Sequence, residues 1–136
     1  TGDWSSDVCS SDLHCILGGL MTVNDVKATL GACIVCGEEH LENEVHTACG
    51  ADMMSDVLAF VKDQSVLLTG LCNLQVIRTA EMMDIVCIVF VRGKKPDEGM
   101  VSLAKERGIV LLTTGHRMFS ACGMLYEKGL HGGVSY

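Results

Sequence analysis

The stretch Asp84-Ile-Val-Cys-Ile-Val-Phe-Val-Arg92 decides the fold of this chain. Its seven consecutive apolar residues, 85–91, are rich in β-branched types. A strand with one face in water would alternate apolar and polar residues, so this stretch predicts a strand that is buried on both faces. Such a strand needs helices above and below it. The sequence therefore predicts an α/β fold with three layers.

Two further apolar stretches, 65–71 and 109–113, predict strands before and after this one. Helices are expected between the strands, at 74–83 and 97–107. Because each connection is long enough to hold a helix, we expect a mostly parallel sheet with right-handed βαβ crossovers. The remaining expected elements are helices at 23–30, 55–61 and 116–128 and short strands at 32–36 and 44–49.

The chain of 136 residues is expected to hold a single domain, residues 21–131. Residues 1–13 are predicted to be non-native, because 3–13 is what a widely used sequencing adapter gives when translated in one frame. Residues 14–20 are predicted to be an untranslated leader, with Met21 as the natural start. Residues 132–136 are expected to be a loose tail.

The acidic composition limits the classes of partner. The formal net charge is −7 and the pI is about 5.0, which argues against nucleic acid and anionic membranes. Residues 1–13 hold three of the 17 acids and no base, so the remainder has ten bases, 14 acids and a net charge of −4. No apolar run approaches the ~18–20 residues of a membrane span. We therefore expect a bacterial, cytoplasmic protein with reduced thiols.

Polar and cationic residues follow the predicted parallel strands. In such sheets, ligands bind beyond the carboxyl ends of the strands, where helix N-termini present free N–H groups. A phosphate or carboxylate is the expected ligand chemistry. The candidate ligand-binding residues are Asn73, Arg92, Lys94, Thr113, Thr114 and His116. The alternative is that threonine, glycine and asparagine here only form turns and helix caps.

The string Cys33-Ile-Val-Cys36 has the spacing of zinc ligands, with His46 and Cys49 as a second pair. Against a metal site, both cysteines lie in an apolar stretch that predicts a strand, where side chains three residues apart point to opposite faces. A metal or redox protein that uses Cys33, Cys36, His46 and Cys49 remains the alternative hypothesis. The first expectation is buried thiols and no cofactor.

The sequence contains no recognisable catalytic motif. There is no phosphate-binding lysine loop and no nucleophile elbow, so we expect no enzyme activity. Asp52 and Asp56 lie four residues apart and could chelate a cation from one helix face, or they could cap a helix. A small enzyme that uses Asp52, Asp56 or His116 is the third hypothesis.

Six stretches in the same order, over about 110 residues, resemble the DRTGG domain family, a module also found at the N-terminus of HPr kinase/phosphorylase. They are Met21-Thr-Val-Asn-Asp25, Gly37-Glu-Glu39, Asp52-Met-Met-Ser-Asp-Val57, Gly93-Lys-Lys-Pro-Asp-Glu98, Ala104-Lys-Glu-Arg-Gly-Ile109 and Leu111-Leu-Thr-Thr114. The name-giving string is absent; Glu42-Asn-Glu-Val-His-Thr-Ala48 stands in its place.

The resemblance implies a regulatory, ligand-sensing module that is homodimeric and has no catalysis of its own. It further implies action through self-association or a partner enzyme, with an adenine nucleotide as candidate ligand. The chain has no P-loop, so it is not expected to be an HPr kinase.

Overall fold

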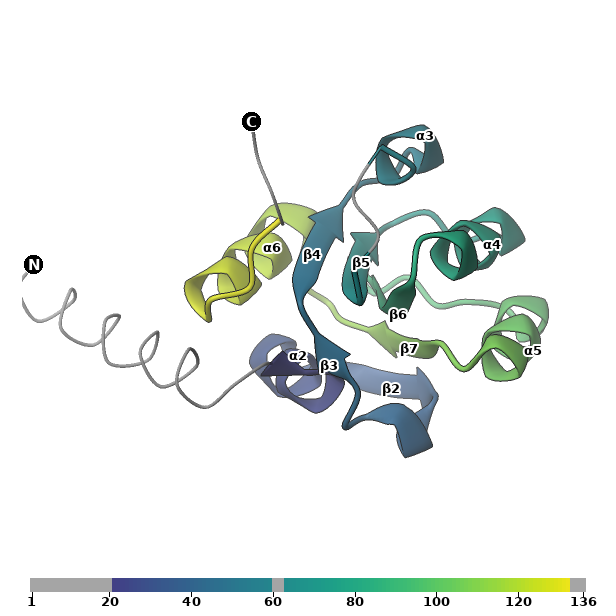
Figure 1. Ribbon diagram of the computed structural model, residues 1–136, viewed down its shortest axis with the longest axis horizontal. Helices are drawn as coiled ribbons and strands as arrows, with labels where there is room; N and C mark the ends of the chain where they lie inside the picture. The colour runs from purple at the N-terminus through teal and green to yellow at the C-terminus, as the bar shows by residue number, and fades with distance from the viewer. Residues whose placement is uncertain (1–20, 60–62, 133–136) are drawn as a thin grey trace, which may run out of the picture.

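The computed structural model describes residues 21–59 and 63–132. Its centre is a five-stranded sheet with the order β2-β7-β6-β5-β4 (Figure 1). The strands are β2 (Cys33–Cys36), β4 (Thr47–Gly50), β5 (Ser65–Thr69), β6 (Ile85–Phe90) and β7 (Val110–Thr113). All neighbours pair in parallel except β2, which runs antiparallel to β7. The prediction of a mostly parallel sheet is confirmed.

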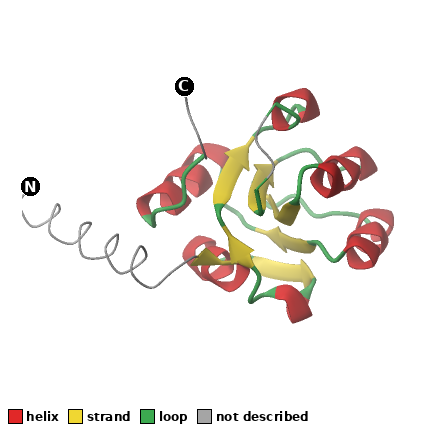
Figure 2. Ribbon diagram, viewed as in Figure 1, coloured by secondary structure: helices red, strands yellow, loops and turns green. Residues whose placement is uncertain are grey.

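Helices cover both faces of this sheet (Figures 1 and 2). One face carries α3 (Met54–Val57), α4 (Leu74–Met82) and α5 (Glu98–Arg107), and the other carries α2 (Val23–Leu30) and α6 (Met118–Glu127). A small separate sheet joins β1 (Met21–Thr22) to β3 (Glu44–Val45), and the 3₁₀ turn η1 spans Glu38–His40. The predicted three layers are confirmed. No helix in 21–59 or 63–132 is long and apolar enough to cross a bilayer.

Strand β6 serves two hydrophobic cores at once. Cys87 and Val89 pack with the buried residues of α2 and α6, whereas Ile88 and Phe90 pack with those of α4 and α5. All four side chains are fully buried. Since successive residues of a strand point to opposite faces, a strand between two helical layers has no position for a polar side chain. This arrangement explains the unbroken apolar run.

Helices α2 and α5 begin at the residues that their capping chemistry indicates. Thr22 Oγ1 accepts a hydrogen bond from the Asp25 N–H at 3.2 Å, and Asp25 Oδ2 accepts one from the Thr22 N–H at 2.9 Å. Asp97 Oδ1 likewise accepts from the Met100 N–H at 2.9 Å, and Gly108, with φ +70°, caps the end of α5. Side chains that satisfy the free N–H groups of a first turn fix where a helix starts.

Several predicted boundaries are wrong. Helix α6 begins at Met118 rather than at His116, since the loop after β7 continues to Arg117. The expected strand at 44–49 is divided between β3 and β4, with His46 between them.

Some predictions concern residues outside those described. They include the non-native character of residues 1–13, the leader at 14–20, most of the tail at 132–136 and the end of the helix expected at 55–61. These stay predictions. Helix α3, as described, spans Met54–Val57.

Candidate functional site

Four loops leave the parallel strands at one edge of the sheet, because the carboxyl ends of parallel neighbours lie together. They are residues 51–53 after β4, 70–73 after β5, 91–97 after β6 and 114–117 after β7. We call these four loops the rim. Every predicted ligand-binding residue except Thr113, the last residue of β7, lies in it. The sequence therefore located this edge of the molecule correctly.

Backbone hydrogen bonds join the loop after β6 to the loop after β7. The Arg92 N–H donates to the His116 carbonyl at 2.8 Å, and the Gly93 N–H donates to the Thr114 carbonyl at 2.8 Å. The pairing of the two strands thus continues beyond their ends. It holds Arg92 in a left-handed conformation, with φ +58°, which is uncommon for a residue with a side chain.

The two threonines at the end of β7 use their hydroxyl groups within the protein. Thr113 donates to the Lys94 carbonyl at 2.7 Å, and the buried Thr114 donates to the Leu30 carbonyl at 3.1 Å. Thr114 Oγ1 also accepts the His116 N–H at 3.3 Å. These hydroxyls fix the loops, as the alternative of turn chemistry expected.

Asn73 also has a structural contact. Its Oδ1 accepts the Val76 N–H at 3.3 Å and caps α4. The remaining candidates, Arg92, Lys94 and His116, are exposed at the rim. For all six residues, contact with a ligand stays a prediction.

Asp52 organises the rim, a role that neither interpretation of its sequence position, chelation or helix capping, predicted. It precedes α3, so it cannot share a helix face with Asp56, and the proposed chelating pair is wrong. Its Oδ1 instead accepts the Gly70 N–H at 2.7 Å and the Thr69 hydroxyl at 3.2 Å. The signal available in the sequence was an acid two residues after a strand end. Asp52 therefore ties the end of β4 to the turn after β5.

The guanidinium of Arg92 lies against this same turn. A Cβ added to Gly70 would lie 2.8 Å from Arg92 Nη2 and 3.5 Å from Asp52 Oδ1. Gly70 thus leaves the space that Arg92 occupies. The side chain from the loop after β6 reaches across the end of β5, so three of the four rim loops meet here.

The rim is cationic in a chain that is acidic overall. Four of the ten basic residues of the sequence, Arg92, Lys94, Lys95 and Arg117, lie in the loops after β6 and β7. All four are exposed. The acids of the four loops are Asp52 and Asp97, and both accept backbone N–H groups. Four cations against two acids leave an excess of two positive charges. The sequence predicted a helix over residues 116–128, so Arg117 was not expected in this loop.

The alternative metal site is wrong. Cys33 and Cys36 lie on β2 and Cys49 lies on β4, at opposite edges of the sheet. Four strand spacings of about 4.8 Å separate these edges by roughly 19 Å. His46 Nδ1 lies 2.7 Å from Asp63 Oδ1. Within 21–59 and 63–132, no group of three or more His, Cys, Asp or Glu side chains is placed to hold a metal ion.

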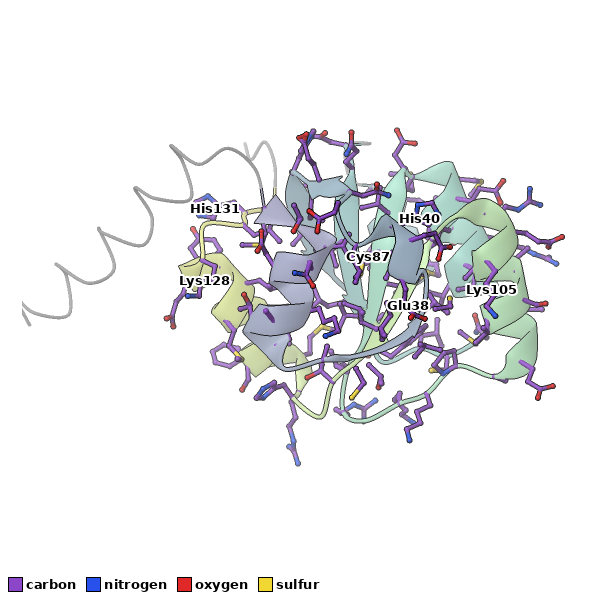
Figure 3. All side chains as sticks on the ribbon, turned by 90° about the horizontal axis from the view of Figure 1, so that it is seen from below. Glu38, His40, Cys87, Lys105, Lys128 and His131 are labelled. Carbon is purple, nitrogen blue, oxygen red and sulfur yellow. The ribbon has the colours of Figure 1, made fainter. Side chains whose placement is uncertain are left out.

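Burial keeps several thiols protonated. Removal from water, with smaller contributions from Cys122 and Asp56, raises the pKa of Cys49 to about 12 from an ordinary 9.0. Burial also raises the pKa of Cys87, which lies inside the protein between the helical layers (Figure 3). Because the thiolate is the form that reacts and binds metals, we expect these two thiols to react slowly in the folded state.

We expect iodoacetamide at neutral pH to label Cys33, which is exposed, and to leave Cys49 and Cys87 unlabelled until urea unfolds the protein. Peptide mass spectrometry measures this order. Labelling of Cys87 as fast as Cys33 in the folded protein would contradict the assignment.

The raised pKa of Cys49 in the folded state makes stability depend on pH. Its contribution to stability is fully present below pH 9.0, the ordinary value, and is lost as the pH rises from there towards 12. The free energy of unfolding should therefore fall over that window.

Comparison with known proteins agrees with this architecture. Residues 25–127 match the DRTGG domain family. The fold is similar to a crystal structure of the CBS and DRTGG domains from the regulatory region of Clostridium perfringens pyrophosphatase, complexed with the activator diadenosine tetraphosphate. The TM-score is 0.64 at 18% identity, covering 79% of this chain and 46% of that chain. At this identity the likeness shows the fold alone. No curated protein matches the chain in sequence.

Proposed function

Because this chain belongs to the DRTGG domain family, we propose that it is a regulatory module that binds a nucleotide or another phosphate-bearing anion at the rim and has no catalysis of its own. One observation supports the proposal that the ligand is an anion. Four exposed cations lie in two adjacent loops that hydrogen-bond to each other, within an otherwise acidic chain. The regulatory role rests on the family.

The geometry of Arg92 favours anion binding. Its backbone is fixed by the bond to His116, so less conformational freedom is lost when a ligand arrives. A guanidinium presents a planar fork of N–H donors that matches phosphate oxygens. Lys94, Lys95 and Arg117 add positive charge nearby. His116, in the same loop as Arg117, supplies a further ring nitrogen at this edge.

An adenine nucleotide is the first ligand to test. The structural neighbour was crystallised with diadenosine tetraphosphate, in a structure that holds CBS domains as well as DRTGG domains. That ligand combines two adenine groups with four phosphates. The cationic rim of this chain would suit the phosphate portion, which supports adenine nucleotides as candidates here.

The module is further proposed to act in the bacterial cytoplasm, through a homodimer or through a partner enzyme. The neighbour is the regulatory region of a pyrophosphatase, and this chain covers less than half of the chain in that structure. A regulatory domain without catalysis must transmit binding to another surface. Native mass spectrometry that shows only monomers, with and without nucleotide, would contradict the homodimer.

We expect Arg92→Ala to weaken binding of the best ligand from a panel of AMP, ADP, ATP, acetyl phosphate and inorganic phosphate by at least tenfold. A hydrogen bond to a charged group contributes about 1.5–3 kcal/mol, and 1.4 kcal/mol is a factor of ten. Isothermal titration calorimetry measures the affinity, and a thermal-shift panel selects the ligand. His116→Ala should also weaken binding.

Arg107→Ala is the matched control. It removes the same charge from the last turn of α5, where Arg107 Nε lies 3.2 Å from Glu81 Oε2 at the surface. Binding should be unchanged, because screening limits the effect of a distant exposed charge. Equal losses in Arg92→Ala and Arg107→Ala would mean that only the net charge matters, and would contradict a site at the rim.

A further inference from the structure

The first turn of α6 lies over the carboxyl end of β4. A Cβ added to Gly50, the last residue of β4, would lie 3.3 Å from Met118 Sδ and 2.7 Å from Cys122 Sγ. The rim loop 51–53 begins at the next residue. The start of α6 and the rim loop after β4 are therefore neighbours.

Arg92 belongs to the same end of the sheet. Asp52, two residues after Gly50, accepts the Gly70 N–H, and the Arg92 guanidinium packs against Gly70. The path from Met118 through Gly50 and Asp52 to Arg92 thus runs through direct contacts and one short stretch of chain. Residues beside Met118 lie next to the cationic rim.

Phe119 is the residue that follows Met118, and its side chain is 91% exposed. It is not needed in the core, because the inner face of α6 is filled by Ala121 and Leu125, both fully buried. Leaving a phenylalanine in water forgoes the stabilisation that burial of its ring would give. Its position is unlike that of Phe90, which is fully buried. An aromatic ring so exposed, two residues after Arg117, suits contact with a ligand.

Resting on the proposed phosphate site, we infer that Phe119 is a specificity-determining residue that stacks on the base of a nucleotide whose phosphates contact the rim cations. Aromatic side chains stack on any base through its flat face, and cations hold the phosphates. The combination recognises a nucleotide and discriminates against a phosphate compound that lacks a base. The ligand class is therefore a nucleotide and not a free phosphate or acyl phosphate.

The test uses two matched ligand pairs, AMP with ribose 5-phosphate and ATP with inorganic triphosphate. By calorimetry, Phe119→Ala should weaken binding of the nucleotide of each pair about 5- to 100-fold, since base stacking gives effects of this size. The affinity for the base-free ligand should not change. Phe119→Tyr should restore nucleotide affinity. Tyr126→Ala is the control, because Tyr126 lies seven residues later on the same flank of α6 and stacks on His131 instead.

A spectroscopic signature separates stacking from a merely structural role. Trp4 is the only tryptophan of the sequence, so the W4F/F119W double variant has one tryptophan, at the proposed stacking position. AMP should quench its fluorescence saturably, and ribose 5-phosphate should not.

The outcomes distinguish this inference from the proposed function. If Phe119→Ala binds AMP and ATP as tightly as the unaltered protein while Arg92→Ala does not, the stacking role is overturned and the phosphate site stands. Equal affinity of the unaltered protein for both members of each pair overturns base recognition in the same way. If none of the four compounds binds, the inference fails, and the proposed function fails with it when ADP, acetyl phosphate and inorganic phosphate do not bind either.

Discussion

Phe90→Ala is expected to lower the free energy of unfolding by about 3–5 kcal/mol, the largest effect among the substitutions considered. Phe90 is fully buried on β6 and packs in the core beneath α4 and α5. Truncation removes the transfer free energy of the ring and leaves a cavity that a well-packed interior fills only partly. The residues around it, including Leu67, Ile88 and Leu111, are held in place by the sheet.

Urea unfolding, followed by far-ultraviolet circular dichroism, measures this loss. Phe119→Ala is the matched control: the same change at a side chain that is 91% exposed should alter the free energy of unfolding by no more than about 0.5 kcal/mol. A similar loss in both variants would mean that Phe119 is packed in solution. The control also establishes that the Phe119→Ala variant is folded in the binding experiments.

Gly37→Ala is expected to cost about 2–5 kcal/mol in the same assay. Gly37 has φ +95°, and a Cβ added there would lie 2.8 Å from Val110 Cα and 2.9 Å from Val110 Cγ2. The close atoms include the backbone of a central strand, so the neighbour cannot rotate away. Steric overlap in a packed core costs about 1–3 kcal/mol, and a left-handed conformation adds about 1–2 kcal/mol.

Gly31→Ala isolates the backbone contribution. Gly31 has φ +59°, but a Cβ added there would meet nothing within 4 Å. Only the conformational cost of about 1–2 kcal/mol should appear. Equal losses at Gly31 and Gly37 would show that β7 does not approach Gly37 as closely as described.

Most of the fold could be predicted because its signals are local. The apolar run 85–91 indicates a helical layer on each face of the sheet. Thr22, Asn73 and Asp97 indicate helix starts, because each side chain accepts a hydrogen bond from the backbone N–H three residues later. Boundaries failed where a tertiary contact ends an element. Strand β5 stops at Thr69, whose Oγ1 accepts the Leu71 N–H and donates to Asp52, and no local pattern contains that bond.

The sequence predicted where the rim lies but not which contacts hold it together. Parallel strands place their carboxyl ends together, so the sequence predicted that Arg92, Lys94 and His116 lie at one edge of the sheet. The partner of Thr114 is the carbonyl of Leu30, 84 residues away, and could not be read from the chain. The role of Asp52 depends on β4 lying beside β5. Strand order is a property of the whole sheet, which is why these roles were missed.

The strand order also decides against the shared metal site of the cysteine hypothesis. The spacing of Cys33 and Cys36 is that of a metal site, but the second pair lies on the far side of the sheet. A register irregularity between Ile34 and Cys36 leaves Cys33 exposed and Cys36 buried. Two cysteines on one short strand therefore have different environments.

The measurement that tests the central claim most directly is a ¹H–¹⁵N amide shift map of the protein titrated with ATP. Saturable shifts should appear in the rim loops, above all at Gly93, Gly115, His116 and Arg117, and should require at least tenfold more ATP in Arg92→Ala. Shifts confined to another surface, such as the last turn of α5, would contradict the proposed site. An unchanged spectrum at millimolar ATP would show that the rim does not bind this nucleotide.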